Sequence, residues 1–230
     1  LVLWLSRFYP RLRGAYDLGL FYQDGGVASL AWIAVPLALA VVLVRWQRKW
    51  AVPIAMAGIG LAGMILQLVL LFAFQVLHGH VYAEVSLIIT GFMAGLALGA
   101  ASGNRLLATR LPTSELRTRR TLIGVQLAIA LCSGIFVLIL QLPLPASTLV
   151  FPLLALLAGA LGGIAFPLSL ALLRMRGEAG YATGLLYGAD LVGGCLGALF
   201  GAVLLIPIFG IPQTCAVVAL VSLAGLVALA

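Results

Sequence analysis

The sequence predicts an all-α fold, a polytopic membrane bundle of about seven transmembrane helices. Of its 230 residues, 64% are hydrophobic and only 8% are charged, and the mean hydropathy is +1.23. A soluble domain carries about 25% charged residues, so this composition cannot cover a surface that faces water. Because a helix needs about 20 apolar residues to cross a bilayer core, seven such helices would take up most of the chain.

Short segments rich in proline, glycine or charge separate the apolar runs, and these residues interrupt or end helices. The predicted spans are residues 27–45, 51–77, 83–103, 120–141, 147–173, 182–207 and 213–230. Residues 1–26 mix aromatic side chains with three arginines, which is typical of a segment at a membrane surface. We therefore expect residues 1–26 to be an interfacial or linker segment after a soluble domain, and residues 27–230 to form the transmembrane bundle.

The basic residues are distributed very unevenly between the predicted loops. Ten of the 13 Lys and Arg residues lie in three alternate loops, residues 45–50, 104–120 and 174–180. The positive-inside rule places these loops in the cytoplasm of a protein of the inner (plasma) membrane. Clusters of this kind contact anionic lipid head groups, so we expect no nucleic acid partner. Seven spans would leave residues 1–26 outside with the other three arginines, so either an upstream translocated domain overrides the local charge or the first segment does not cross the membrane.

Two ladders of glycine at four-residue spacing mark the third and sixth predicted spans. They are Gly91, Gly95, Gly99 and Gly103 in the third span, and Gly193, Gly197 and Gly201 in the sixth. Residues four apart share a helix face, and glycine lets two helix backbones approach closely within lipid. The ladders predict tight helix packing or, alternatively, helices that slide. Their offset of 102 residues, from 91 to 193, suggests two three-helix repeats, spans two to four and five to seven.

Asp190 is the main candidate for a functional residue, because it is an acidic side chain within the sixth predicted span. A carboxylate there costs about 2.5–3.5 kcal/mol on insertion scales, so it must face the bundle or a wet cavity. It could couple protons, contact a substrate ammonium group or bind a cation. The structural alternative is a hydrogen-bond hub with Tyr181, Tyr187 or Gln126.

Further polar candidates lie in and after the second span. Gln67 and Gln75 are eight residues apart, which places them on one helix face where amides often join helices. His78 and His80 precede Glu84, a pattern that could bind a metal or sense pH. Because a third ligand is not apparent, we predict an interfacial polar cluster and no metal site. No motif for a catalytic residue or a cofactor is found.

Several runs of sequence resemble a known family. They are residues 3–10 (LWLSRFYP), 64–82 (MILQLVLLFAFQVLHGHVY), 91–99 (GFMAGLALG), 166–168 (FPL) and 184–201 (GLLYGADLVGGCLGALFG). Together they resemble the membrane half of bacterial spermidine-synthase-like fusion proteins, in which a polyamine aminopropyltransferase domain is joined to major-facilitator-like helices. The family commonly has Glu where this chain has Gln67. Its catalytic parts, a Gly-rich nucleotide-binding turn and acidic residues for the amines, have no counterpart in this sequence.

The resemblance implies a membrane domain that anchors or regulates a soluble aminopropyltransferase-like domain of the same parent chain. A second similarity concerns residues 99–105 (GAASGNR) and the basic loop after them, which resemble one six-helix half of a major facilitator transporter. It implies a half-transporter for a small cation or polyamine, with Asp190 as its carboxylate and a partner half elsewhere. A third hypothesis is a structural subunit whose glycine faces dock partner helices or a second copy of the chain.

Overall fold

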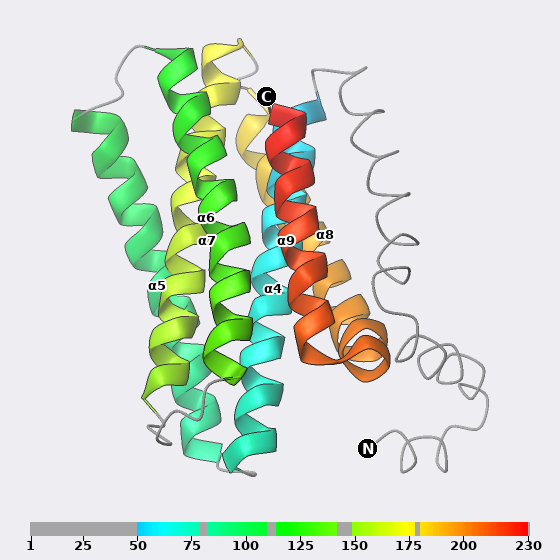
Figure 1. Ribbon diagram of the computed structural model, residues 1–230. Coiled ribbons are helices and arrows are strands. Elements are labelled where there is room, and N and C mark those ends of the chain that lie inside the picture. Colours follow the sequence, from blue (N-terminus) through cyan, green and yellow to red (C-terminus); the bar gives the residue numbers. More distant parts are fainter. Residues whose placement is uncertain (1–49, 79–81, 110–113, 142–148, 178–179, 230) are drawn as a thin grey trace.

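The computed structural model describes residues 50–78, 82–109, 114–141, 149–177 and 180–229, and these residues are almost entirely helical (Figure 1). The helices are α4 (Ala51–His78), α5 (Tyr82–Thr109), α6 (Glu115–Gln141), α7 (Val150–Met175), α8 (Ala182–Phe200), the π-helix η3 (Gly201–Phe209) and α9 (Gly210–Leu229). The prediction of a helical membrane protein is confirmed, because five helical segments among the described residues are long and apolar enough to cross a membrane.

The predicted count of seven spans is not supported. The first predicted span, residues 27–45, lies outside the described residues, as does the predicted interfacial segment 1–26. The sixth and seventh predicted spans join in one helical stretch of 48 residues, Ala182–Leu229. A straight helix of that length would measure about 72 Å, more than twice the thickness of a bilayer core.

This stretch reverses direction where the sequence predicts a turn. The chain passes from α8 into η3, which contains Pro207, and Gly210 then adopts a φ of 80° that L side chains rarely tolerate. Before the turn, α8 runs parallel to α4, since Gly193 faces Ala57 and Gly197 faces Leu61. After it, α9 returns antiparallel to α4 (Figure 1). The break predicted for residues 208–212 is therefore a helical reversal instead of a loop.

The helices form two layers. One layer has the order α8, α4, α7, α5, because α4 packs on α8 and α7, and α7 packs on α5. In the second layer, α9 packs on α4 and α6, and α6 packs on α7. The buried residues of α6 include Leu122, Ile129 and Phe136, which recur every seven residues and belong to the apolar core. The apolar core lies between these layers, with α4 at its centre.

Glycines permit the two closest helix contacts. A Cβ on Gly95 of α5 would collide with the Leu156 carbonyl of α7, and one on Gly99 would collide with the Ala160 carbonyl. In the same way, a Cβ on Gly193 of α8 would collide with the Ala57 carbonyl of α4. The predicted ladder residues Gly91, Gly95, Gly99 and Gly103 all face α7, whereas Gly193, Gly197 and Gly201 all face α4.

The contacts repeat with inverted direction. The helices α4, α5 and α6 correspond to α7, α8 and α9, in that order. Under this correspondence, the contact between α4 and α8 matches the contact between α7 and α5, and the helices of both pairs run parallel. Because α4 and α7 run in opposite directions, the two units of three helices are inverted. Gly95 faces Leu156 as Gly193 faces Ala57, which gives offsets of 98 (95 to 193) and 99 (57 to 156). The structural offset is thus about one helical turn shorter than the 102 residues between the starts of the ladders.

The described basic residues gather at one end of the bundle. They are Arg105 near the end of α5, Arg117, Arg119 and Arg120 at the start of α6, and Arg174 and Arg176 at the end of α7. The Nε of Arg176 lies 3.0 Å from Oε1 of Glu115, and the Nε of Arg119 donates to the Leu229 carbonyl. At the opposite end, the described residues include no Lys or Arg. The helix directions therefore bring together the described arginines of two predicted basic loops, residues 104–120 and 174–180.

Candidate functional site

Asp190 lies in the middle of α8 and directly against α4. Its carbonyl oxygen and its Oδ1 both meet Gly60, where an added Cβ would lie only 2.6 Å from Oδ1. The close approach follows from Gly193, one turn further along α8, which lets the two helix backbones touch. Gly60 thus provides a notch for the carboxylate, and no larger residue fits there without displacing it.

The Asp190 carboxylate has no protein partner within the described part of the chain. No hydrogen bond or ion pair joins it, and the residue is half-buried. The predicted hub residues lie elsewhere: Tyr181 and Tyr187 are 60% and 57% exposed, and the Gln126 amide donates to the Ala55 carbonyl at 3.4 Å. The structure therefore leaves the carboxylate available to a ligand.

Gln67 lies on the same side of α4 as Gly60. Gln67 is seven positions after Gly60, which makes almost two full turns and a distance of about 10.5 Å along the helix. The Gln67 side chain is only 5% exposed, yet no hydrogen bond to its amide is present among the described residues. Helical side chains lean toward the N-terminus of their helix, which is the direction of Gly60 from Gln67. Gln75, also predicted, is half-buried two turns further on, at the end of α4.

The described structure therefore presents the Asp190 carboxylate between α4 and α8, and the largely buried Gln67 side chain on the Gly60 side of α4. A carboxylate offers only acceptor oxygens, and an amide offers both an acceptor and donors. Such groups suit a cation or an ammonium group, which supplies charge and N–H donors. Gly60 was missed by sequence reasoning, although Gly58, Gly60 and Gly63 in the centre of α4 were an available signal.

His78 and Glu84 form a separate group at the end of the bundle opposite the arginines. The His78 ring stacks on Phe74 at a centroid distance of 4.9 Å and meets the edge of Phe151 at 5.6 Å. Both His78 ring nitrogens and Oε2 of Glu84 are buried without a hydrogen bond in the described structure. His80 lies outside the described residues, and among those described no three His, Cys, Asp or Glu side chains could hold a metal ion.

Comparisons with protein-family models, curated protein sequences and solved structures gave no match. The class of the protein is therefore argued from its helices and its site alone. They define a helical membrane protein with apolar helices suited to a lipid bilayer and a polar seam between two of them.

Proposed function

We propose that this chain is a membrane domain of six crossings, α4 to α9, with its basic end in the cytoplasm. The inverted relation between α4–α6 and α7–α9 supports six crossings. In it, α8 corresponds to α5 and α9 corresponds to α6, so α8 and α9 count as two separate crossings. Each half of a major facilitator transporter is built from inverted three-helix repeats of this kind. The gathering of the described arginines at one end supports the orientation.

Within this domain, the function that the geometry supports best is binding of a small organic cation or polyamine by half of a transporter. The observation that carries the proposal is the contact of the unpaired Asp190 with Gly60. Because α4 and α8 belong to different repeats, this contact lies at the repeat interface. Substrate and ion sites of secondary transporters lie at that interface, near the middle of the bilayer.

The chemistry follows from the low polarity of the bundle interior. A carboxylate surrounded by apolar helices attracts a cation much more strongly than one in water does. Asp190 would neutralise an ammonium group, and the Gln67 amide oxygen would accept a hydrogen bond from a second polar group of the ligand. Gly60 keeps Oδ1 uncovered by a side chain. Because a proton and an ammonium group compete for one carboxylate, binding of one releases the other.

The direct test is uptake of labelled spermidine into vesicles from cells that produce the full chain. Asp190→Asn keeps the size of the side chain and removes its charge, so uptake should be lost while the amount of protein in the membrane is unchanged. The control is Cys195→Ser on the exposed face of the same helix, which should leave uptake intact. Normal uptake by the Asp190→Asn variant would refute the transport proposal.

A second candidate is the membrane anchor of a spermidine-synthase-like fusion protein. In its favour, α4 begins at the end of the bundle that carries the described arginines, where a cytoplasmic domain would reside. Intact mass spectrometry of the native polypeptide tests it. A mass well above 24.0 kDa with peptides of an upstream soluble domain, together with aminopropyl transfer, is the expected result. A mass near 24.0 kDa would exclude the fusion.

A further inference from the structure

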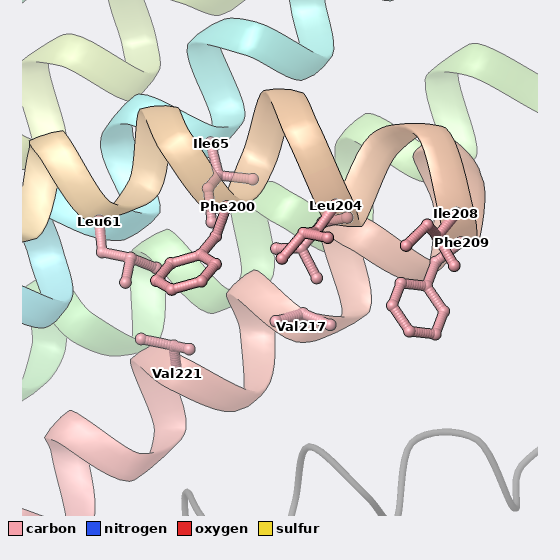
Figure 2. A pocket seen from close by; sticks show the side chains of 9 residues that line it. Leu61, Ile65, Phe200, Leu204, Ile208, Phe209, Val217 and Val221 are labelled. Carbon is pink, nitrogen blue, oxygen red and sulfur yellow. The ribbon is translucent and has the colours of Figure 1, made fainter. Parts of the chain in front are cut away.

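An apolar cavity of about 330 Å³ lies where the α8–α9 reversal meets α4. Figure 2 shows its side chains in a row between the ribbon of α8 and η3 and the ribbon of α9. Its lining consists of Leu, Ile, Val and Phe side chains, among them Leu61, Ile65, Phe200, Leu204, Val217 and Val221. Every one of these side chains is a hydrocarbon, so the cavity offers nothing to water, to an ion or to the amine proposed for Asp190.

The cavity results from the way in which the chain reverses. Up to Gly201, α8 follows α4 closely, because that glycine meets the Ile65 side chain. After the turn, α9 returns on another side of α4, where Val221 faces Gly58. The two arms therefore diverge around α4, and Leu61 and Ile65 form the floor of the wedge between them (Figure 2). Phe200 lies at the opening and is 43% exposed.

The position of the cavity indicates what fills it. Leu61 and Ile65 are near the middle of the 28-residue α4, and Phe209 ends η3, at the reversal. Figure 1 shows the reversal on the side away from the ends of α5 and α7, which carry described arginines. The cavity thus extends from the reversal toward the middle of α4, which would place it within one half of a bilayer that α4 crosses. Half of the hydrocarbon core is about 15 Å thick, which is the depth that one lipid tail occupies.

We propose that this cavity holds one acyl chain of a phospholipid from the leaflet opposite the basic end. Protein interiors are close-packed, and an empty space forfeits the dispersion contacts of every side chain around it. Apolar cavities of about 150 Å³ already take up apolar ligands. In a bilayer, the apolar molecule present at the highest concentration is the lipid itself. The acyl chain supports the reversal from inside and so holds α8, which carries Asp190, in place.

Photolabelling in vesicles tests this site independently of transport. The full chain is reconstituted with a phosphatidylcholine that carries a diazirine on one acyl chain, and labelled residues are mapped after illumination. Leu204, Val217 and Val221 should be labelled severalfold more than Val227, which is an outward-facing residue of α9 that is 39% exposed. Equal labelling of cavity and outward-facing residues would overturn the proposal.

Two matched variants of α9 sharpen the test. Val221→Phe places a ring in the cavity, and it should abolish labelling of Leu204 and the retention of one lipid in native mass spectrometry. Val227→Phe adds the same ring outside the cavity and should change neither. Labelling of Leu204 by the lipid that persists in Val221→Phe would refute the acyl-chain site. If Val221→Phe does not fold, the labelling pattern of the unaltered chain still decides.

Discussion

Gly60 of α4 and Asp190 of α8 form a contact in which glycine is the only residue that leaves the carboxylate in place. A Cβ on Gly60 would lie 2.6 Å from Oδ1 of Asp190 and would also collide with the Asp190 carbonyl. Because the backbone carbonyl cannot yield without moving α8, an added methyl group must displace the helix or the carboxylate. This relation links the packing of the two repeats to the only acidic side chain described in the middle of a spanning helix.

The first prediction concerns Gly60→Ala. The methyl group should displace the Asp190 carboxylate and weaken binding of a diamine about tenfold, since a hydrogen bond to a charged group contributes about 1.5–3 kcal/mol. Isothermal titration of the purified chain measures the change. Gly124→Ala on α6 is the matched control, because nothing lies within 4 Å of a Cβ there. Equal diamine affinities of the Gly60→Ala variant and the unaltered chain would show that the space at Gly60 does not determine binding by Asp190.

The second prediction concerns the glycine seams. Gly95→Leu and Gly197→Leu force a side chain against the backbone of the partner helix, so each should lower the free energy of unfolding by about 3 kcal/mol. Gly134→Leu places the same side chain where a Cβ meets no atom within 4 Å, and should change stability little. Thermal unfolding in detergent gives the comparison. A similar loss in all three variants would show that packing against the partner helix does not determine the effect, because Gly→Leu raises helix propensity at every one of these sites.

The third prediction concerns orientation. Leu116 at the basic end is 64% exposed and Tyr82 at the opposite end is 86% exposed, so each can carry a single reporter thiol. In a Cys195→Ser background, a membrane-impermeant maleimide should label Tyr82→Cys in spheroplasts, whose inner membrane is still intact. It should label Leu116→Cys only after the membrane is permeabilised. The reverse pattern would place the arginines outside and contradict the positive-inside assignment.

The fourth prediction concerns the ion pair between Arg176 and Glu115, whose side chains are 30% and 48% exposed. Surface ion pairs contribute about 0–1 kcal/mol because water and salt screen them. Glu115→Gln should therefore change the melting temperature by only a few degrees, and the change should shrink in 1 M salt. A large, salt-independent loss would show that this pair, instead of the apolar seams, holds α6 to α7.

Much of the helical pattern could be predicted from hydropathy. The predicted span 51–77 corresponds to Ala51–His78, and 147–173 corresponds to Val150–Met175. Helix ends were less predictable: α5 extends to Thr109 and α6 begins at Glu115, inside the loop predicted for residues 104–120. Hydropathy indicates where lipid contact ends, whereas Leu and Arg favour continued helix beyond that point.

The sequence singled out Asp190 as a candidate residue but did not indicate its neighbour. Insertion cost singles out a carboxylate in an apolar run from local information alone. The contact with Gly60 joins residues 130 positions apart, from 60 to 190, and no local periodicity encodes it. The glycine ladders indicated close packing, yet their four-residue period fits offsets of 98 and 102 equally well. Only the structure, in which Gly95 and Gly193 face equivalent carbonyls, distinguishes the two.

The most direct test of the cation site is spermidine binding to the purified full chain, compared between the unaltered protein and Asp190→Asn at constant pH. The account predicts saturable binding of one amine per site that releases protons on titration in the unaltered protein. It predicts that Asp190→Asn loses this binding and keeps the same melting temperature. Undiminished binding in a folded Asp190→Asn variant would contradict the assignment of Asp190 as the cation ligand.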